Sequence, residues 1–470
     1  MWWRKAARRW NSGLENREVG LGTCRKEQER PYGKSAAILK KGKGWMLLFC
    51  FCLTSVVNGC GNDDAMEDGY NVSHIMEDEY NADHAMESGY GSHANVNHAA
   101  QDEYSGSHTA GNGAKRRRLE EIKAAAKSYQ DIYGKAAAEN KLGHLETMQK
   151  IVERLGAHGY CAVDGEIQNQ VNMTNPEQIE EFCLLVAEKK NGNASFFSVM
   201  EDGGLMCFDL ESLEGEVYVT RNVLHWNGEV PEVGYTSCYR VSEWKYSENG
   251  YLFFRESIPE GYDGEQGYTA VRVKPLDGKC RELNRKYILP IGYGGNNMFL
   301  LDWSQENLEL LDFDDLFPKL YSYVFRTRTP YEPTVDGKLY WVPEEEYEKV
   351  ITSYFRVEKE TLRAGKNYLK EEQAYEYRTR GFYDCACSPN NPYPEVVSYE
   401  EREDGTILLT VDAIWPKESM EQAICHEVVV EPLENGGFHY LSNRVLPLEG
   451  NVEPTWYVEK ITDTAAILGD

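Results

Sequence analysis

The apolar run from Trp45 to Val57 is the feature that most constrains this sequence, because it separates an N-terminal stretch from the part that can fold. The run has thirteen residues, whereas a helix that spans a bilayer needs about 20. Lysines precede the run, and small residues follow it. A basic stretch, a short apolar core and small residues at a cleavage point are typical of a secretory signal peptide. We therefore expect residues 40–59 to be a signal peptide.

The run leads into Val57-Asn58-Gly59-Cys60, which resembles the lipobox of bacterial lipoproteins. The resemblance implies that the Cys60 thiol receives a diacylglyceryl group carrying fatty chains such as palmitate, and that the chain is cut before this residue. Two acyl chains give stable anchoring, whereas one chain binds a membrane marginally. The implied location is the extracytoplasmic face of a bacterial cell membrane. The alternative is a buried helix that happens to contain these cysteines, but the sequence after Cys60 is too polar to continue a core.

Residues 1–39 do not belong to this signal. Arg8-Arg9 suggests a twin-arginine export signal, but the apolar core begins more than thirty residues later. We favour the interpretation that residues 1–39 are an extension and that translation starts further in, near Leu39.

The charge of the chain excludes one class of partner. The formal charge is −27, and residues 1–59 contain 12 Lys and Arg against 4 Asp and Glu, so the remainder carries −35. Phosphate contacts need a basic surface, so we expect no nucleic-acid binding. The 31 Tyr and 10 Trp fit either a preference for strands or an aromatic binding face, and the sequence leaves both open.

A repeat of about ten residues follows the lipobox. Its units are AMEDGYNVSH (65–74), IMEDEYNADH (75–84), AMESGYGSH (85–93) and AAQDEYSGSH (99–108). Their apolar content is too low to bury a core, so we expect residues 60–113 to form a disordered tether with a reach of about 40 Å. Imidazoles among carboxylates also suit weak binding of a divalent metal; the candidate ligands are His74, His84, His93, His98 and His108.

The rest of the chain predicts an α+β fold with N-terminal helices, an antiparallel meander, central helices and C-terminal antiparallel strands. Apolar spacing predicts helices over about 115–140 and 145–155, and Thr174-Asn175-Pro176-Glu177 predicts a capping box at the start of a third helix. Strand-like runs follow at 195–200, 205–210 and 216–223 and then at 235–241, 250–255 and 269–273.

After residue 280 the pattern becomes helical again, around 280–285, 313–323 and 343–355, and it returns to strands at 406–415, 427–432 and 437–442. A boundary within Thr327-Arg328-Thr329-Pro330 divides this part into residues 114–330 and 331–470. Several of the eight cysteines after Cys60 lie in apolar runs, as Cys183 and Cys207 do, and we interpret them as small core residues.

Four segments carry a resemblance to a known family. CRELNRKYILPIGYGGNNMFLLDW (280–303), NPYPEVVSY (391–399), DGTILLTV (404–411) and AAAENKLGHLETMQKIVERLG (136–156) resemble segments of a family of uncharacterised lipoproteins of gut Firmicutes, a domain of unknown function. The resemblance runs from about Leu119 to the C-terminus. It implies a membrane-anchored lipoprotein of a Gram-positive bacterium, and it brings no activity with it.

Catalytic and cofactor motifs are not recognisable, so we expect no cofactor. His426-Glu427 precedes three valines rather than completing a zinc-protease motif. Ser242-Glu243-Trp244-Lys245 matches Ser-x-x-Lys without its companion motifs. Gly33-Lys34-Ser35 lacks the upstream glycine of a phosphate loop, and Gly292-Tyr293-Gly294-Gly295 does not follow the strand that a dinucleotide site needs.

Two clusters remain as weaker candidates. Cys385 and Cys387 could hold a soft metal, with Cys425 and His426 completing four ligands, or they could form a redox pair. The alternative is that the two cysteines lie close together in a loop by chance. Asp312, Asp314 and Asp315 suit either calcium or the start of a helix, and we favour the helix start.

We therefore expect a lipid-anchored, extracytoplasmic protein that binds a partner and does not catalyse a reaction. The partner classes we consider are a cell-wall glycan and a protein. An unrecognised cell-surface hydrolase and metal capture by the histidine repeat are the alternatives.

Overall fold

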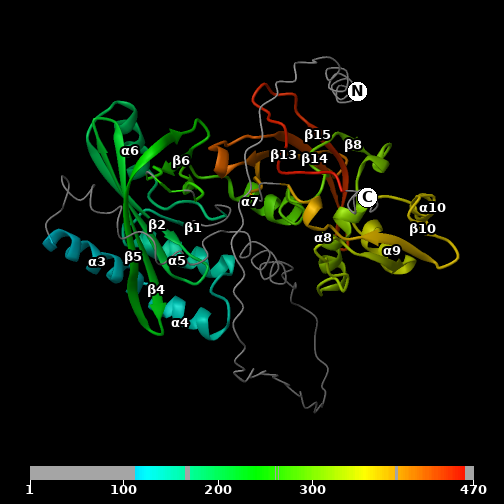
Figure 1. The fold of residues 1–470 in the computed structure, drawn as a ribbon, viewed down its shortest axis with the longest axis horizontal. Helices are drawn as coiled ribbons and strands as arrows, with labels where there is room; N and C mark the ends of the chain where they lie inside the picture. Colours follow the sequence, from blue (N-terminus) through cyan, green and yellow to red (C-terminus); the bar gives the residue numbers. More distant parts are fainter. Residues whose placement is uncertain (1–111, 165–169, 260, 263, 387–389, 461–470) are drawn as a thin grey trace, which may run out of the picture. The chain divides into compact units, whose positions relative to one another are not determined.

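The computed structural model describes residues 112–164, 170–259, 261–262, 264–386 and 390–460 of the chain (Figure 1). It has the predicted α+β fold, with helices and mainly antiparallel sheets. N-terminal helices, a meander, central helices and C-terminal strands follow one another in the predicted order. The extension, the signal peptide and the histidine repeat lie outside the described residues.

Three helices open the described part of the chain: α3 (Asn112–Lys127), α4 (Gln130–Ala138) and α5 (Leu145–Ala157). The prediction of one helix over 115–140 is wrong, because the helix breaks at Ser128 and Tyr129. The Ser128 carbonyl accepts a hydrogen bond from Arg154 Nη1 at 2.8 Å. The buried Tyr129 hydroxyl donates to the Gly203 carbonyl at 3.0 Å. These long-range contacts replace the local pattern that the apolar spacing suggested.

Helix α6 (Glu177–Ala187) confirms the third predicted helix, and its buried residues are the predicted Ile179, Phe182, Cys183 and Val186. The predicted capping box is wrong, however. Pro176 occupies the N-cap position, and the helix start has no side-chain cap. The Thr174 hydroxyl instead accepts from the Ala162 amide at 3.1 Å, because a bridge joins these two residues.

A seven-stranded sheet follows in simple chain order, which confirms the meander. Its strands are β1 (Ala162–Asp164), β2 (Gly192–Val199), β3 (Leu205–Leu213), β4 (Glu216–Asn227), β5 (Val230–Tyr246), β6 (Tyr251–Glu256) and β7 (Tyr268–Arg272). The three-residue strand β1 was not predicted, and it pairs with β2 in parallel. Every other pair in this sheet is antiparallel.

Both faces of the seven-stranded sheet are covered around β3. Side chains of β3 alternate between faces: Cys207 packs in a cluster with Ile122 and Ile151 of the first helices, whereas Phe208 packs in a cluster with Phe182 of α6. Burial on both faces explains the continuous apolar runs at the start of β3 and of β6, whereas most of β5 is exposed or half-buried.

The middle of the chain is helical and carries a small sheet. The helices are α7 (Gly278–Leu283), a π-helical turn (Asn284–Ile288), a 3-10 turn (Leu308–Leu310), α8 (Phe313–Phe325), α9 (Glu344–Thr352) and α10 (Lys359–Arg363). The strands are β9 (Leu339–Pro343), β10 (Tyr368–Leu369) and β11 (Ala374–Arg378), in the order β10-β11-β9. The predicted helices are confirmed, and this small sheet was not predicted.

A five-stranded antiparallel sheet ends the fold, in the order β12-β13-β14-β15-β8. Its strands are β8 (Trp303–Ser304), β12 (Tyr393–Glu401), β13 (Ile407–Ile414), β14 (Cys425–Pro432) and β15 (Phe438–Val445). In Figure 1, β13, β14 and β15 lie side by side in the orange-to-red part of the chain. The predicted apolar face is confirmed, since Ile407, Leu409, Val411, Ala413 and Trp415 are all buried in the largest hydrophobic cluster.

That largest cluster contains residues from Leu276 to Trp456. The expected boundary near residue 330 stays a prediction. None of the helices in the described part of the chain has both the length and the apolar character that crossing a bilayer requires.

Candidate functional site

The predicted lipidation site and the predicted metal ligands lie in the part of the sequence that the structure does not describe. They are Cys60, His74, His84, His93, His98 and His108. Both sites stay predictions.

The described residues do not assemble the cysteine-histidine metal site. Cys425 and His426 are neighbours on strand β14, so their side chains point to opposite faces of the sheet. Cys385 is exposed, and Cys387 lies outside the described residues. Within the described ranges, no group of three or more histidines, cysteines and carboxylates is placed to hold a metal ion.

His426 has a different role, in a buried chain of hydrogen bonds. Its Nε2 lies 2.8 Å from the Tyr293 hydroxyl, and its Nδ1 lies 2.7 Å from Asn443 Oδ1. Asn443 Nδ2 in turn donates to the Leu301 carbonyl at 2.8 Å. Burial lowers the pKa of His426 to about 4, although the bond to Asn443 opposes that shift. A neutral ring that donates through Nδ1 and accepts through Nε2 satisfies every bond, so the imidazole stabilises the fold.

The aspartate cluster marks a helix start, as we favoured. The Asp312 side chain accepts from the amides of Asp314 and Asp315 at the first turn of α8. Asp315 pairs with Arg380 at 2.6 Å and with Lys460 at 3.0 Å. Asp314 Oδ1 accepts from the Tyr347 hydroxyl at 2.9 Å, so each carboxylate already has a protein partner that calcium would displace.

Each side chain of the Ser-x-x-Lys match has other partners in this fold. Ser242 lies at an irregularity in the pairing of β5 with β6, and Lys245 is three residues further along the strand. Lys245 Nζ donates to the Ser419 carbonyl at 2.8 Å, and the Ser242 hydroxyl donates to the Glu256 carbonyl at 3.2 Å. These separate partners favour the interpretation of the motif as chance.

One group of buried polar residues joins β6 and β7 to β12, and we call Tyr251, Arg272, Tyr393 and Glu395 the ionic junction. Arg272 Nη1 lies 2.5 Å from Glu395 Oε1, and these side chains are 7% and 5% exposed. The Tyr251 hydroxyl donates to Glu395 Oε2 at 2.8 Å, and the Tyr393 hydroxyl donates to the Tyr251 oxygen at 3.3 Å. Burial raises the pKa of Glu395, and the Arg272 guanidinium counters part of that rise.

Further titratable groups surround the junction. Asp412 lies directly opposite Glu395 on β13 and accepts from Gln422 Nε2 at 2.9 Å. Asp164 accepts from the amides of Gln170 and Val171, and burial raises its pKa to about 6. Shifted pKa values mark catalytic sites and structural ion-pair networks alike. Both Glu395 oxygens are bound by protein groups, so the junction has the character of a structural network.

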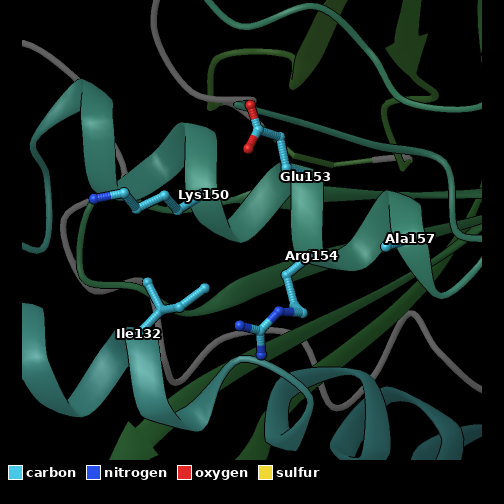
Figure 2. Close-up of a pocket in the computed structure, with 5 residues that line it drawn as sticks. All are labelled: Ile132, Lys150, Glu153, Arg154 and Ala157. Carbon is cyan, nitrogen blue, oxygen red and sulfur yellow. The ribbon is translucent and has the colours of Figure 1, made fainter.

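The described surface also has a shallow hollow between α4 and α5. Its volume is about 340 Å³, and its lining residues are Ile132, Lys150, Glu153, Arg154 and Ala157. Figure 2 shows Ile132 and Arg154 extending into this space, while Glu153 points away from it. Arg154 already binds the Asp131 carboxylate at 3.0 Å and the Ser128 carbonyl. The hollow therefore offers a ligand little beyond the aliphatic surface of Ile132.

A more informative feature is a group of exposed apolar side chains around β9, which we call the β9 patch. Its members and their exposed fractions are Val335 (72%), Leu339 (54%), Trp341 (60%), Phe382 (72%) and Tyr383 (56%). Single exposed apolar residues need no explanation, but a contiguous group of large ones marks interaction sites.

Arg378 connects the strand to the loops that carry the other residues of the patch. Arg378 lies opposite Leu339 in the β9–β11 pair, so the two side chains share a face. The Arg378 guanidinium binds Asp384 Oδ2 at 2.9 Å and the Asp336 carbonyl at 3.2 Å. The Phe382 amide donates to the Val335 carbonyl at 2.7 Å. The face that carries Leu339 and Trp341 therefore continues into the two loops that carry the other patch residues.

The backbone of β9 is also available at one side. The Thr379 amide donates to the Lys338 carbonyl and the Glu344 amide to the Gln373 carbonyl, so the even-numbered residues of β9 face β11. Main-chain groups of alternate residues point to opposite sides in an antiparallel pair. Those of Leu339 and Trp341 therefore point away from β11, toward a side on which no other strand of the described chain pairs.

Our sequence reasoning missed this patch, although a signal for it was present. Lys338-Leu339-Tyr340-Trp341-Val342-Pro343 follows a turn at Asp336-Gly337 and alternates as a strand should. Leu339 and Trp341 are both apolar and occupy the face that is exposed, which is opposite to the face of the buried Val342. Large apolar residues on both faces of a short strand were the available hint.

The fold and these sites describe an α+β protein with a closed polar interior and an apolar edge strand at its surface. The chain belongs to the DUF6070 family, a family of unknown function whose model matches residues 115–460. This match confirms the predicted membership of a domain family of unknown function. No curated protein and no solved structure matches the chain.

Proposed function

We propose that this chain is a lipid-anchored protein on the extracytoplasmic face of a bacterial membrane, of the kind found in gut Firmicutes, and that it binds an extended segment of a partner protein. The observation that carries the proposal is the β9 patch, in which exposed Leu339 and Trp341 side chains flank a strand edge that pairs with no other described strand. An extended peptide recognises such an edge through main-chain hydrogen bonds, and side chains on alternate positions provide specificity.

The chemistry of the patch favours a peptide over a glycan. Hydroxyl-rich ligands need free polar side chains beside the aromatic rings, yet the Arg378 guanidinium on this face is held by Asp384 and the Asp336 carbonyl. The main-chain amides and carbonyls of Leu339 and Trp341 lie at the edge beside apolar side chains, and Glu376 lies opposite Trp341 on the same face. Those main-chain groups are the ones with which a strand pairs.

Binding can be tested with the mature full-length chain and a phage-displayed library of random peptides. We expect enrichment of peptides with alternating apolar residues. Trp341→Ser should weaken the selected peptide by at least about tenfold, equivalent to about 1.4 kcal/mol, because central Trp residues are frequent hot spots. Tyr399→Ser is the matched control, since Tyr399 is exposed on β12 of another sheet, and it should change affinity less than about twofold.

Two results would contradict this part of the proposal. One is that no peptide is enriched, and the other is equal binding by wild type and Trp341→Ser. A cell-wall glycan that binds the wild type and loses affinity on Trp341→Ser would replace the peptide as the class of partner.

The anchor rests on the signal sequence and on Cys60, and it can be tested separately. We expect the wild-type protein to fractionate with membranes and its N-terminal peptide to start at a diacylglyceryl-modified Cys60. Cys60→Ala should release the protein or leave residues 40–59 attached. Mass spectrometry that finds Cys60 unmodified in membrane-bound wild type would refute the anchor without affecting the peptide site.

A further inference from the structure

One charged side chain beside the β9 patch, the half-buried Glu376 carboxylate, has no ion-pair partner among the described residues. Glu376 lies opposite Trp341 in the β9–β11 pair, so the two side chains share the exposed face. The Glu376 amide donates to the Asn367 carbonyl at 2.7 Å, on the side of β11 that faces away from β9. The two residues therefore form a pair without main-chain hydrogen bonds between them, which is the pair type that brings cross-strand side chains closest together.

The two basic residues closest to this pair in the sequence are engaged elsewhere. Arg378, the next residue of β11 on this face, binds the Asp384 carboxylate at 2.9 Å. Lys338 lies over the Tyr340 ring, with its Nζ 4.5 Å from the ring centroid. Tyr340 and Trp341 are neighbours on a strand, so their side chains point to opposite faces. Neither cation therefore neutralises the carboxylate beside Trp341.

A strand added to the free side of β9 would place one of its side chains opposite Trp341 on the exposed face. Neighbouring strands lie about 4.8 Å apart, so the added residue would be about 10 Å from Glu376, with the indole between them. Lys and Arg have long aliphatic stems that pack along apolar surface and end in a charge. Such a stem can cross the indole, make a cation–π contact with it and bring its charge to the carboxylate.

We infer that Trp341 and Glu376 form a site for a cationic side chain, so that the partner segment carries a Lys or Arg opposite Trp341. The adjacent alternate position faces Leu339 and Arg378. Since Asp384 already binds the Arg378 guanidinium, that position takes an apolar residue. The net charge of −27 on the chain also attracts a cationic partner. The place of the cation within a peptide rests on the proposed function, whereas the cation site itself does not.

The specificity can be tested by running the peptide selection in parallel on the mature full-length wild type and on Glu376→Lys. We expect a Lys or Arg at one alternate position of the peptides that the wild type enriches, and an Asp or Glu at that position for Glu376→Lys. For the wild-type peptide, Glu376→Lys should weaken binding about tenfold and Glu376→Gln about fivefold, because an exposed cation site contributes modestly. Glu400→Lys is the matched control, since Glu400 is exposed on β12 of another sheet, and it should change affinity less than about twofold.

A small cation tests the site without a peptide. N-acetyl-argininamide should shift the indole N–H resonance of Trp341 in the wild-type protein, and the absence of this resonance from the spectrum of Trp341→Ser assigns it. The affinity measured from the shift should be about fivefold weaker in Glu376→Gln. The neutral analogue N-acetyl-glutaminamide should leave the resonance unchanged, and Glu400→Gln should respond as the wild type does.

The two proposals fail in different ways. Peptides that depend on Trp341 but show no charge preference, together with an indole that does not respond to the arginine derivative, would overturn the cation site and leave the proposed function standing. An equal response in wild type and Glu376→Gln would also overturn it. If the indole responds through Glu376 but no peptide is enriched, the cation site stands and the proposed binding of an extended segment fails.

Discussion

In the ionic junction, charged side chains lie inside the protein, whereas in the β9 patch large apolar side chains lie outside it. Arg272 and Glu395 at the junction are almost fully buried, and Trp341 in the patch is 60% exposed. A charge inside the protein needs a partner for the fold to persist. An exposed indole gains little for the fold and becomes useful when a second surface covers it. The comparison therefore assigns stability to the first region and recognition to the second.

The strongest way to break the comparison is to remove one partner of the buried pair. Arg272→Ala leaves Glu395 without its cation in a site that excludes water, so we expect a loss of about 3–5 kcal/mol in the free energy of unfolding. Urea denaturation measures the loss. Arg240→Ala is the control, because Arg240 pairs with Glu216 at the surface, where such pairs contribute about 0–1 kcal/mol. Equal effects of the two substitutions would show that the junction does not hold the fold together.

The second prediction concerns pH and the buried His426. Burial lowers its pKa in the folded state to about 4, whereas the unfolded chain has the ordinary value of about 6.5. As the pH falls, the unfolded state therefore binds a proton at a higher pH than the folded state does. The contribution of the neutral His426 to the free energy of unfolding is complete above pH of about 6.5 and is lost as the pH falls toward 4. The full difference is about 3 kcal/mol at order of magnitude.

Buried carboxylates change stability with pH in the opposite direction, so the effect of His426 must be measured as a difference between two variants. The pKa values of Asp164 and Asp314 rise to about 6 because both groups are buried. Their contribution is complete below the unfolded value of about 3.8 and is lost as the pH rises toward 6. The informative quantity is therefore the difference between wild type and His426→Gln over pH 4 to 7. A difference that does not change with pH would contradict a neutral, buried imidazole.

Removing a single hydroxyl from the junction should have a smaller effect. Tyr251→Phe keeps the ring under Arg272 and deletes the donor to Glu395 Oε2. Loss of a hydrogen bond to a charged group costs about 1.5–3 kcal/mol, which is less than we expect for Arg272→Ala. Thermal unfolding of both variants in the same buffer shows which substitution causes the larger loss of stability. If Tyr251→Phe destabilises the protein as much as Arg272→Ala does, the hydroxyl, rather than the guanidinium, keeps Glu395 charged.

The sequence predicted the elements whose periodicity reflects a single buried face. Helix α6 and strand β13 follow the expected apolar positions residue by residue, because one neighbouring layer determines their pattern. Prediction failed where distant contacts decide the local structure. The Ser128 break depends on Arg154, and the Thr174 hydroxyl pairs with Ala162 rather than capping α6. Local spacing contains no information about those partners.

The candidate sites also differed in whether the sequence could predict them. The aspartates at the start of α8 were interpreted correctly, since helix capping is a local property. The junction was not predictable, because Arg272 and Glu395 are 123 residues apart and arginines and glutamates are numerous in the sequence. The patch was missed because exposure depends on which layer covers a strand. A sequence shows that Trp341 is apolar, but only the fold shows that nothing described packs over it.

The last prediction has the smallest effect on stability and sharpens the comparison most. Trp341→Ser removes a side chain that contributes little to the core, so we expect the free energy of unfolding to change by less than about 0.5 kcal/mol. The same substitution should weaken the selected peptide by at least about tenfold. Measuring both quantities on one preparation, by urea denaturation and by calorimetry, separates recognition from folding. A stability loss of 2 kcal/mol or more, on the order expected for a buried aromatic residue, would show that Trp341 belongs to the core and that the β9 patch is not a free surface.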